Sequence, residues 1–330
     1  MSAPDVRIGI VSWNTSDLLG ICLAALPAAI GDLRAEVVVV DNASADDSAD
    51  IASTYDVRVV RNPTNVGYAR AMNQALADTE APVLLALNPD TAPPPGSLAA
   101  LVERLHAEPT AGVVVPRLVH ADGRLQHSAY RFPSVPLAAV VCFVPPRWQR
   151  GRIGRRWWLE GAAPHDRSGP VDWAIGAVHA VRREALDGAP PYSERWFMYA
   201  EDVELCWRLA RRGWSTVLAA DVDVPHVGNA AGAQAWGSGR DRRWWAASYD
   251  LYSQQRGALA TRRWAVVNTS GVLVHLALNL LGALVPGSHR GQRRATARAL
   301  AGVLSIHARA AVVGPAALAE DAGVVRATAP

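Results

Sequence analysis

Residues 6–120 alternate short apolar runs with segments of helical periodicity, and this alternation limits the fold more than any other feature of the sequence. The apolar runs predict strands at Val6–Ser12, Glu36–Val40, Val57–Arg61, Pro82–Leu87 and Gly112–Pro116. A strand that is apolar on both faces has to be covered on both sides, so the pattern predicts an α/β fold with a mostly parallel central sheet. Ligands of such sheets bind beyond the carboxyl ends of the strands.

Helices are expected between these strands and again near the end of the chain. One helix should be capped by Thr15 or Ser16, and further helices are predicted at residues 44–55, 67–78, 98–106, 201–212 and 241–310. The second helix has a capping-box-like start formed by Ser44 and Asp47. Residues 216–219 are expected as one more strand. Residues 117–170 contain several prolines and predict loops, with a flexible segment near residues 145–169.

Polar residues follow three of the predicted strands, at the edge where a ligand would bind. They are Trp13-Asn14, Asp41-Asn42 and Asn88-Pro89-Asp90. Each pair alone is explained by ordinary turn and helix-cap chemistry, but together on one edge they can hold a divalent cation on a diphosphate. The turn after the first strand lacks a glycine-rich dinucleotide fingerprint, and no Walker sequence occurs. The sequence therefore argues against a dinucleotide oxidoreductase and a P-loop NTPase.

Two acidic residues and a histidine in the second half of the chain are further candidates for chemistry. Glu201 and Asp202 start a helix, where the helix dipole alone favours carboxylates. His226 lies just beyond a predicted strand, and taken by itself a core or loop position explains it better than a site does. Three aromatic side chains near these acids can stack on a sugar ring or simply pack in a core: Trp173, Trp196 and Tyr199.

Charge is distributed unevenly along the chain. The formal net charge is +3, all 33 basic residues are arginine, and Arg240–Arg298 alone holds ten arginines and two acidic residues. A net charge this small gives no case for a nucleic-acid binder. Within the basic stretch, Trp264–Val285 is nearly long enough to span a bilayer, but polar residues such as Asn268 and His275 interrupt it. Three widely spaced cysteines fit a reducing compartment.

Several motifs occur in a fixed order along residues 6–230. They are Ile10-Val11-Ser12-Trp13-Asn14, Val40-Asp41-Asn42-Ala43-Ser44, Asn62-Pro63-Thr64-Asn65-Val66-Gly67-Tyr68-Ala69, Leu87-Asn88-Pro89-Asp90, Gly176-Ala177-Val178, Phe197-Met198-Tyr199-Ala200-Glu201-Asp202, Gly213-Trp214 and His226. This ordered set resembles the family 2 inverting glycosyltransferases of the GT-A fold, and within them the bacterial rhamnosyltransferase-like branch. The motifs are specific for the family and much less specific for the sugar.

The resemblance implies a Rossmann-like GT-A fold and a role for each part of the chain. Residues 1–240 would be the catalytic domain, with a nucleotide-sugar-binding half in residues 1–116 and an acceptor half in residues 117–240. Residues 241–330 would form a basic, partly apolar helical tail. The nucleotide-sugar would be bound by Ser12, Asn14, Asp41, Asn65, Gly67, Asn73, Asn88 and Asp90. The acceptor contacts are expected from residue type and position, not from the resemblance, and they are Trp173, Trp196 and Tyr199.

The resemblance also implies a metal and a catalytic base. Asp90 and His226 would be the metal ligands, for Mg²⁺ or Mn²⁺, and Asn88 stands where the family's D-x-D motif has its first aspartate. Asp202 would be the catalytic base, next to Glu201. The base would take the proton of an acceptor hydroxyl as that oxygen attacks the sugar, and the cation would stabilise the departing nucleoside diphosphate.

The reaction implied is the transfer of a sugar onto a polyprenyl-diphosphate-linked or polysaccharide acceptor, and L-rhamnose from dTDP-rhamnose is the sugar that the resemblance favours. Galactofuranose, N-acetylglucosamine and mannose stay open as alternatives. A non-catalytic glycan- or nucleotide-binding protein is an alternative of another class, and a nucleotidyltransferase would need a basic glycine-rich loop that is absent near the first strand.

The basic, tryptophan-containing apolar stretch suits the anionic inner leaflet of a membrane. We therefore expect a cytoplasmic protein that is peripheral at the inner face of the cell membrane. The alternative is that this helix packs on the catalytic domain with solvated arginines around it.

Overall fold

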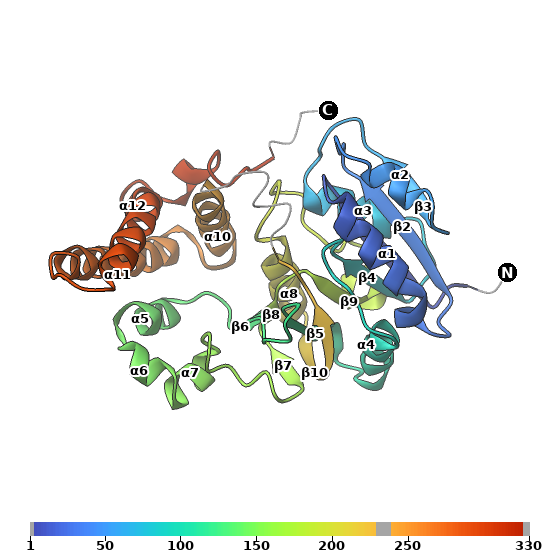
Figure 1. Ribbon diagram of the computed structural model, residues 1–330, viewed down its shortest axis with the longest axis horizontal. Coiled ribbons are helices and arrows are strands. Elements are labelled where there is room, and N and C mark those ends of the chain that lie inside the picture. Colours follow the sequence, from blue (N-terminus) through green and yellow to red (C-terminus); the bar gives the residue numbers. More distant parts are fainter. Residues whose placement is uncertain (1–2, 229–238, 326–330) are drawn as a thin grey trace. The chain divides into compact units, whose positions relative to one another are not determined.

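The computed structural model describes residues 3–228 and 239–325, which belong to two compact units (Figure 1). The first unit comprises Met1–Phe132 and Ala163–Ala235, and the second comprises Pro133–Ala162 and Trp236–Pro330. The structure thus groups residues 133–162 with the C-terminal helices, whereas the sequence analysis assigned them to the acceptor half. The functional roles of the predicted domains stay predictions.

The first unit contains two sheets and the helices that cover the larger one. Its elements, in chain order, are β1 (Val6–Ser12), α1 (Ser16–Ile30), β2 (Ala35–Asp41), α2 (Ser48–Ala52), β3 (Arg58–Arg61), α3 (Tyr68–Leu76), β4 (Val83–Leu87), α4 (Ser97–Ala107), β5 (Ala111–Val119), β6 (Ala129–Tyr130), β7 (Gly169–Val171), β8 (Trp173–Ala174), β9 (Val178–Arg182), η1 (Arg183–Leu186), α8 (Glu201–Arg211) and β10 (Ser215–Pro225).

The large sheet has the strand order β3-β2-β1-β4-β9-β5-β10-β7. Strands β1 to β4 pair in parallel, and so do β5 and β10, whereas β9 is antiparallel to both of its neighbours and β7 is antiparallel to β10. The predicted α/β fold with a mostly parallel sheet is confirmed. The sequence analysis did not anticipate β9, which inserts between β4 and β5 and separates two parallel blocks.

The core of the first unit follows the alternation of side chains along the strands. Ile8 and Ile10 of β1 are fully buried in a cluster with the leucines of α1 and α4, which cover that face of the sheet. Gly9 points to the opposite face, where a Cβ atom would come within 2.9 Å of the Cβ of Ala75 in α3. Glycine at this position therefore lets α3 lie close against β1.

Two predicted helix caps differ from the structure. Helix α1 begins at Ser16 as expected, but the Thr15 hydroxyl lies 2.8 Å from the Ser12 hydroxyl and does not cap the helix. Helix α2 begins later than predicted, because Asp46 accepts hydrogen bonds from the Ser48 amide at 3.1 Å and the Ser48 hydroxyl at 2.6 Å. Ser44 accepts a bond from the Asn14 amide instead of forming a capping box.

The second unit is helical. Its elements are α5 (Val135–Phe143), α6 (Pro146–Gln149), α7 (Arg152–Trp157), α10 (Arg240–Arg256), α11 (Ala258–Gly282), α12 (Arg290–Val312) and η3 (Pro315–Leu318). The prediction of loops is wrong for residues 135–143, 146–149 and 152–157, because Pro136 and Pro146 stand in the first turns of helices, where no amide hydrogen is needed. Pro136 follows the Ser134 cap of α5, whose hydroxyl accepts a bond from the Leu137 amide, and Pro146 begins α6.

Helix α11 is the centre of the second unit. A Cβ atom at Gly271 would clash with Cys142, so glycine allows α5 to pack closely there, and the His275 ring bonds the Cys142 carbonyl at 2.8 Å. Asn268 donates to the buried Tyr249 hydroxyl at 3.0 Å. The polar residues that interrupt the apolar stretch therefore have partners inside this unit. Helix α11 is still long and apolar enough to cross a membrane. Only 17% of its most apolar 18-residue stretch is buried.

Candidate active site

The carboxyl ends of β1, β2 and β4 lie side by side at one edge of the large sheet. Ser12 pairs in register with Asp41, and Ile10 pairs with Leu87, which places Asn88 just beyond the same edge. These strand ends carry the polar residues predicted to bind a nucleotide-sugar. The parallel topology therefore brings together side chains that are far apart in the sequence.

Asp41 is the most telling side chain at the end of β2. It is 6% exposed, and its Oδ2 atom accepts a bond from the Ser44 amide at 3.3 Å. Its Oδ1 atom is buried and has no hydrogen-bond partner among the described residues. Leaving a buried carboxylate oxygen unpaired is unfavourable, so this atom is suited to accept a hydrogen bond from a ligand. Ser12, by contrast, is fully buried and bonded to Thr15.

Asn14 and Asn65 shape the loops around Asp41. Asn14 has a left-handed backbone with a φ of 52°, and its Oδ1 atom accepts a bond from the Ala45 amide at 2.7 Å. The Asn65 Oδ1 atom accepts bonds from the Gly67 amide at 3.0 Å and from the Asn42 side chain at 2.9 Å. Asn42 also accepts a bond from the Val66 amide at 3.0 Å. From the sequence, Asn42 was expected at this edge beside Asp41 but was given no role of its own, although the cluster of short amide side chains was an available signal.

Gly67 marks the closest backbone approach at this edge. Its φ is 89°, and a Cβ atom would lie 2.5 Å from the Phe197 carbonyl oxygen. The Tyr68 amide donates to the same oxygen at 2.9 Å. The approach that the structure shows at Gly67 is thus to the backbone of residue 197, which leads into the segment before α8. Binding of the nucleotide at Gly67 stays a prediction.

Asn73 lies further along α3 and is engaged elsewhere. Its side-chain amide donates to the Tyr192 carbonyl at 2.8 Å and to Glu194 at 3.1 Å, and its oxygen accepts from the Tyr192 amide at 3.1 Å. These bonds hold the segment 192–194 against α3. The structure therefore gives Asn73 a positioning role and does not bring it together with the strand-end residues.

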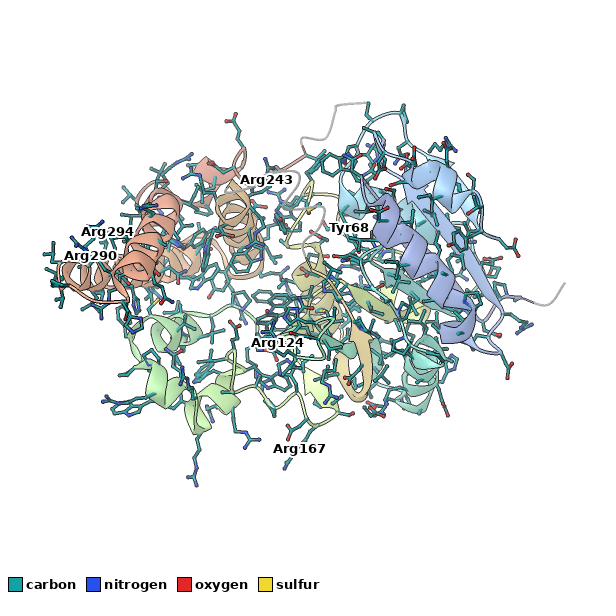
Figure 2. All side chains as sticks on the ribbon, viewed as in Figure 1. Tyr68, Arg124, Arg167, Arg243, Arg290 and Arg294 are labelled. Carbon is teal, nitrogen blue, oxygen red and sulfur yellow. The ribbon has the colours of Figure 1, made fainter. Side chains whose placement is uncertain are left out.

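Tyr68 contacts two separate parts of the candidate site, and it is labelled on the first unit in Figure 2. Its hydroxyl is 3.3 Å from both the Asn88 Oδ1 atom and the Gly176 carbonyl oxygen. Burial raises the pKa of Tyr68 well above its ordinary value, and the nearby carboxylates of Glu201, Asp202 and Asp90 raise it further. Tyr68 is thus a neutral hydrogen-bond donor that lies near Asp90 and near the Glu201–Asp202 pair. Its position directly after Gly67 in the motif was the only signal in the sequence.

Asp90 and His226 meet because the end of β10 runs beside the turn after β4. The Val227 amide donates to the Asp90 carbonyl at 3.0 Å, and the Asp90 Oδ1 atom lies 3.3 Å from the His226 Nε2 atom. Both side chains are buried. The predicted metal pair is therefore together in space, although no group of three or more His, Cys, Asp or Glu side chains among residues 3–228 and 239–325 is arranged to hold a metal.

The orientation of the His226 ring is set from its far side. Its Nδ1 atom lies 2.9 Å from the Gln126 Oε1 atom, so the Nδ1 hydrogen donates there and the Nε2 lone pair points toward Asp90. The Nε2 atom is buried and makes no hydrogen bond within the described part of the chain. This orphaned nitrogen beside a carboxylate fits a divalent cation, with the remaining ligands coming from a diphosphate and water.

Glu201 and Asp202 are presented by a strained turn at the start of α8. Tyr199 and Ala200 have left-handed φ angles of 75° and 73°, which non-glycine residues adopt only when the surroundings enforce them. Asp202 accepts bonds from the Val203 amide at 2.7 Å and from the Gly176 amide at 3.3 Å. The Glu201 Oε2 atom is buried without a hydrogen bond in the described structure.

The surroundings of Glu201 and Asp202 favour the neutral form of the two side chains to different degrees. Desolvation raises the pKa of Glu201, and the negative charge of Asp202 raises it further. Desolvation also raises the pKa of Asp202, but three backbone amides stabilise its charged form. Asp202 therefore ionises first and Glu201 is kept neutral by it, which is an arrangement that favours Asp202 as the base.

The structure does not support two of the three predicted acceptor contacts. Trp196 is 1% exposed, so neither face of its ring is available for stacking. Trp173 is 8% exposed, is stacked on Tyr130 at 4.5 Å and donates its indole hydrogen to the Arg131 carbonyl. Both behave as core side chains, because a large aromatic surface is most stable when buried. Tyr199 is partly exposed, two residues before Glu201, and stays a predicted acceptor contact.

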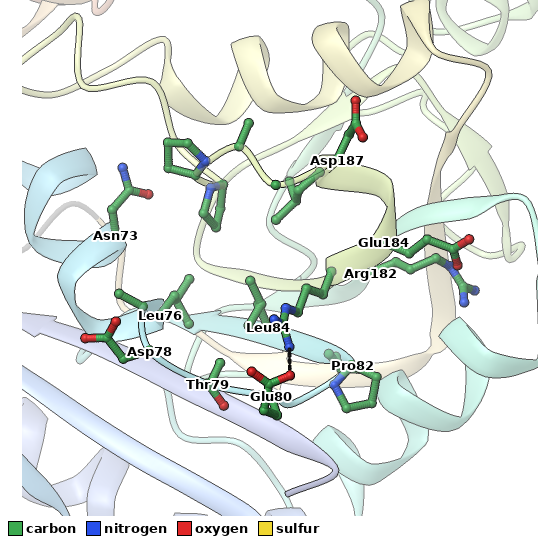
Figure 3. Close-up of a pocket in the computed structure, with 18 of the residues that line it drawn as sticks. Asn73, Leu76, Asp78, Thr79, Glu80, Pro82, Leu84, Arg182, Glu184 and Asp187 are labelled. Carbon is green, nitrogen blue, oxygen red and sulfur yellow. Dashed lines mark hydrogen bonds and ion pairs between the residues drawn. The ribbon is translucent and has the colours of Figure 1, made fainter. Parts of the chain in front are cut away.

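A cavity of about 890 Å³ lies at the opposite end of the strands (Figure 3). It is lined by the start of β4, the end of β9 and residues 183–191. Its Arg182 side chain donates to the carbonyls of Ala111 at 2.9 Å and Glu108 at 3.1 Å, and Arg183 pairs with Glu80 at 3.3 Å. Because it lies at the amino end of β4, opposite the carboxyl ends that carry Asp41 and Asn88, it is not part of the candidate site.

Comparison with known proteins gives relatives along the same part of the chain. The glycosyl transferase family 2 model matches residues 8–170. N-acetylglucosaminyl-diphospho-decaprenol L-rhamnosyltransferase of Mycobacterium tuberculosis is 32% identical over 203 residues, which are 58% of this chain and 66% of that protein, just under two thirds of its length. Succinoglycan biosynthesis protein ExoU of Rhizobium meliloti is 33% identical over 161 residues, 46% of this chain and 44% of that protein.

A solved structure shows the same fold. The mannosyltransferase PcManGT from Pyrobaculum calidifontis, in complex with GDP-Man and Mn²⁺, matches with a TM-score of 0.55 at 19% identity and covers 94% of this chain and 88% of that chain. The predicted GT-A fold is thereby confirmed. The segment matched by the family model contains the strand ends Ser12 and Asp41 and the Asn88–Asp90 turn, so the predicted resemblance to glycosyl transferase family 2 is confirmed along residues 8–170.

Proposed function

We propose that the chain is an inverting glycosyltransferase that moves a sugar from a nucleotide-diphospho-sugar onto a glycan acceptor. The observation that carries this proposal is the Asp202 carboxylate, which desolvation makes more basic and which the Gly176 and Val203 amides hold in place. A carboxylate of raised pKa is suited to remove a proton from an acceptor hydroxyl during attack on the anomeric carbon. Asp41, at the same sheet edge, supplies an unpaired acceptor for the nucleotide.

Each neighbouring side chain has a part in this mechanism. Glu201 stays protonated and does not compete with Asp202 for the proton, because its own ionisation is disfavoured by burial and by the charge beside it. Tyr68 donates its hydroxyl hydrogen toward Asn88 and the Gly176 carbonyl, so it ties the turn after β4 to the turn before β9, whose Gly176 amide bonds Asp202. Inversion requires the base and the leaving group on opposite faces of the sugar.

A divalent cation fits the pair Asp90 and His226, and PcManGT was solved with Mn²⁺. When bound, such a cation stabilises the charge that develops on a departing diphosphate. Asp90 would supply a carboxylate oxygen and His226 its Nε2 atom, and Gln126 keeps that ring in the required tautomer. Asn88 supplies a neutral oxygen in place of a carboxylate, so the site carries less negative charge for the cation.

Removal of divalent cations is expected to lower the transfer rate at least about a hundredfold, since the leaving group would then lose its main charge partner. Addition of Mn²⁺ or Mg²⁺ to the chelated protein should restore the rate. The variant Gln126→Leu should need several-fold more Mn²⁺ for half-maximal activity, because the His226 ring loses the partner that orients it. Unchanged activity after exhaustive chelation would contradict the metal assignment.

The sugar and acceptor are proposed from the relatives. We propose L-rhamnose from dTDP-rhamnose as the donor and a polyprenyl-diphosphate-linked glycan as the acceptor, because one relative is named an L-rhamnosyltransferase that acts on N-acetylglucosaminyl-diphospho-decaprenol. Galactofuranose, N-acetylglucosamine and mannose are the alternative sugars. Such an acceptor would place the protein at the cytoplasmic face of the cell membrane.

The direct test is a screen of dTDP-, UDP- and GDP-sugars with Mg²⁺ or Mn²⁺ against a polyprenyl-diphosphate-linked acceptor. We expect one nucleotide-sugar to be consumed with formation of a glycosylated lipid of inverted anomeric configuration. Binding of a nucleotide-sugar with neither transfer nor hydrolysis would instead indicate the alternative of a non-catalytic binding protein.

The pH dependence of the reaction separates the two acids. Asp202 has to be ionised to act, so kcat/KM should fall as the pH drops through its raised pKa, which lies well above the value of about 3.9 for an exposed aspartate. Glu201→Gln should leave this acidic limb in place, since Glu201 is already neutral there. Loss of activity in Glu201→Gln over the whole pH range would instead make Glu201 the base.

A further inference from the structure

Division of the chain into its two units sharpens the charge asymmetry. The second unit holds seventeen arginines and five acidic residues, a formal charge of +12, and the first holds sixteen arginines and twenty-five acidic residues, a charge of −9. The difference from the sequence-based expectation comes from residues 133–162, which contribute five arginines and the single acid Glu160 to the second unit. The basic character therefore comes from two segments that are distant in sequence.

The second unit also exposes apolar side chains in both segments. On α11, Leu259, Val266, Leu273 and Leu280 are spaced by seven residues, lie along one side of the helix and are 49% to 65% exposed. The opposite side of α11, with Thr261, Trp264 and Asn268, is buried in the unit. In residues 133–162, Val141 and Phe143 at the end of α5 and Trp148 in α6 are each about half exposed.

The arginines of residues 133–162 lie on α6, on α7 and between these two helices, close in sequence to Phe143 and Trp148. Arg147, Arg150, Arg152, Arg155 and Arg156 are all exposed, and none makes an ion pair within the part of the chain that the structure describes. The Arg147 guanidinium lies 5.5 Å from the centre of the Trp148 ring, and that of Arg156 lies 6.0 Å from the Trp157 ring. Arginine and tryptophan at the ends of apolar helices are typical of protein segments at a membrane–water interface.

The segment 133–162 is held in a defined position within its unit. The Gln149 side chain donates to the carbonyls of Val140, Val141 and Val144, which fixes α6 to the end of α5. Helix α5 in turn packs on α11, where Cys142 meets Gly271 and His275. The arginine-rich helices are therefore part of the same folded body as the apolar side of α11. The further arginines Arg290 and Arg294 lie on α12 of this body (Figure 2).

We infer that the second unit is a docking module for an anionic lipid bilayer, and that residues 133–162 supply its main electrostatic contact. Exposed apolar side chains insert into the interface, and guanidinium groups pair with lipid phosphates, each adding about a factor of five in partitioning near an anionic surface. This complementarity selects a bilayer over a symmetric contact between the second units of two copies, since that contact would bring two units of charge +12 together. Helix α11 lies in the interface in this proposal, because its other side is buried in the unit.

The proposal deepens the proposed action on a lipid-linked acceptor, but its test does not depend on activity. The full chain is sedimented with sucrose-loaded vesicles of phosphatidylcholine and phosphatidylglycerol at 7:3, and with vesicles of phosphatidylcholine alone, at several salt concentrations. The test variant carries Arg→Gln at residues 147, 150, 152, 155 and 156. The matched control carries Arg→Gln at five exposed arginines of the first unit: Arg58, Arg61, Arg70, Arg124 and Arg167.

We expect the wild type to bind the anionic vesicles and to be released by salt. The test variant should bind them at least about a hundredfold more weakly, while the control, with the same net charge, should stay within about fivefold of wild type. Circular dichroism and the midpoint of thermal unfolding confirm that both variants fold. A second variant, Trp148→Ser, should weaken binding severalfold without any change of charge.

Three results would overturn the proposal. The first is binding of the test variant to anionic vesicles with the same affinity as the wild type. That result would assign the docking to residues 241–330 alone. The second is equal weakening in the control, which would reduce the effect to net charge. The third is a raised KM of the test variant for a short, water-soluble acceptor with unchanged vesicle binding, which would make residues 133–162 an acceptor contact. Failure of the proposed transfer activity would leave the vesicle result unaffected, so the two failures are distinguishable.

Discussion

Replacement of Asp202 by asparagine is expected to lower kcat by at least about a thousandfold and to leave the affinity for the nucleotide-sugar within about threefold of wild type. Asparagine keeps the size of the side chain, but its amide cannot take the proton of an acceptor hydroxyl. Asp202 is oriented by the Gly176 and Val203 amides and is not among the strand-end residues proposed to bind the nucleotide. Single-turnover kinetics and donor binding by calorimetry measure the two effects separately.

Asp17→Asn is the matched control for this variant. Asp17 also stands in the first turn of a helix, α1, and it is exposed to solvent. If acids at these positions serve only the helix dipole, both substitutions should have the same small effect of about 0.5 kcal/mol on stability and none on rate. A transfer rate of Asp202→Asn near that of Asp17→Asn would therefore remove Asp202 as the base.

Sequence patterns predicted the parts of the fold and of the candidate site that depend on local order. Strands β1 to β5 and the polar residues at their ends follow from apolar runs that stop at Ser12, Asp41 and Leu87, and the parallel pairing then follows from the alternation with helices. The ordered motifs, through the resemblance to family 2 glycosyltransferases, then selected Asp41, Asp90, Asp202 and His226. The register of β1 with β2 brings Asp41 to its expected place.

Features that depend on contacts distant in sequence were missed. Strand β9 forms only because β4 and β5 pair with it on either side. The sequence around residue 178 carries no local pattern that predicts this pairing. Trp196 looked like an acceptor contact because its neighbours carry chemistry, but the core covers its ring. Tyr68 was missed because the three carboxylates that raise its pKa come from two other segments of the chain. The prolines of residues 133–146 predicted loops because sequence alone does not separate a helix start from a turn.

Replacement of Gly67 by alanine is expected to destabilise the protein by about 3 kcal/mol. It should also reduce transfer more strongly than any substitution away from Asp90 and the Glu201–Asp202 pair. Gly67 has a φ of 89° and a ψ of 164°, a conformation that is almost restricted to glycine. The new methyl group would also lie 2.5 Å from the Phe197 carbonyl oxygen. That oxygen accepts the Tyr68 amide hydrogen, so relief of the clash moves both Tyr68 and the strained turn before Glu201.

Gly257→Ala separates the steric part of this effect from the conformational part. Gly257, between α10 and α11, has a φ of 83° and a ψ of 164°, nearly the angles of Gly67, and a Cβ atom there would have no neighbour within 4 Å. Its replacement should cost about 1 kcal/mol, measured by urea unfolding, with kcat unchanged. The difference of about 2 kcal/mol between the two variants then reports the contact with Phe197. Equal stabilities with full activity in Gly67→Ala would mean that the backbone of residue 197 can withdraw without moving Glu201 and Asp202, and that the left-handed turn at Tyr199 and Ala200 is not what positions the base.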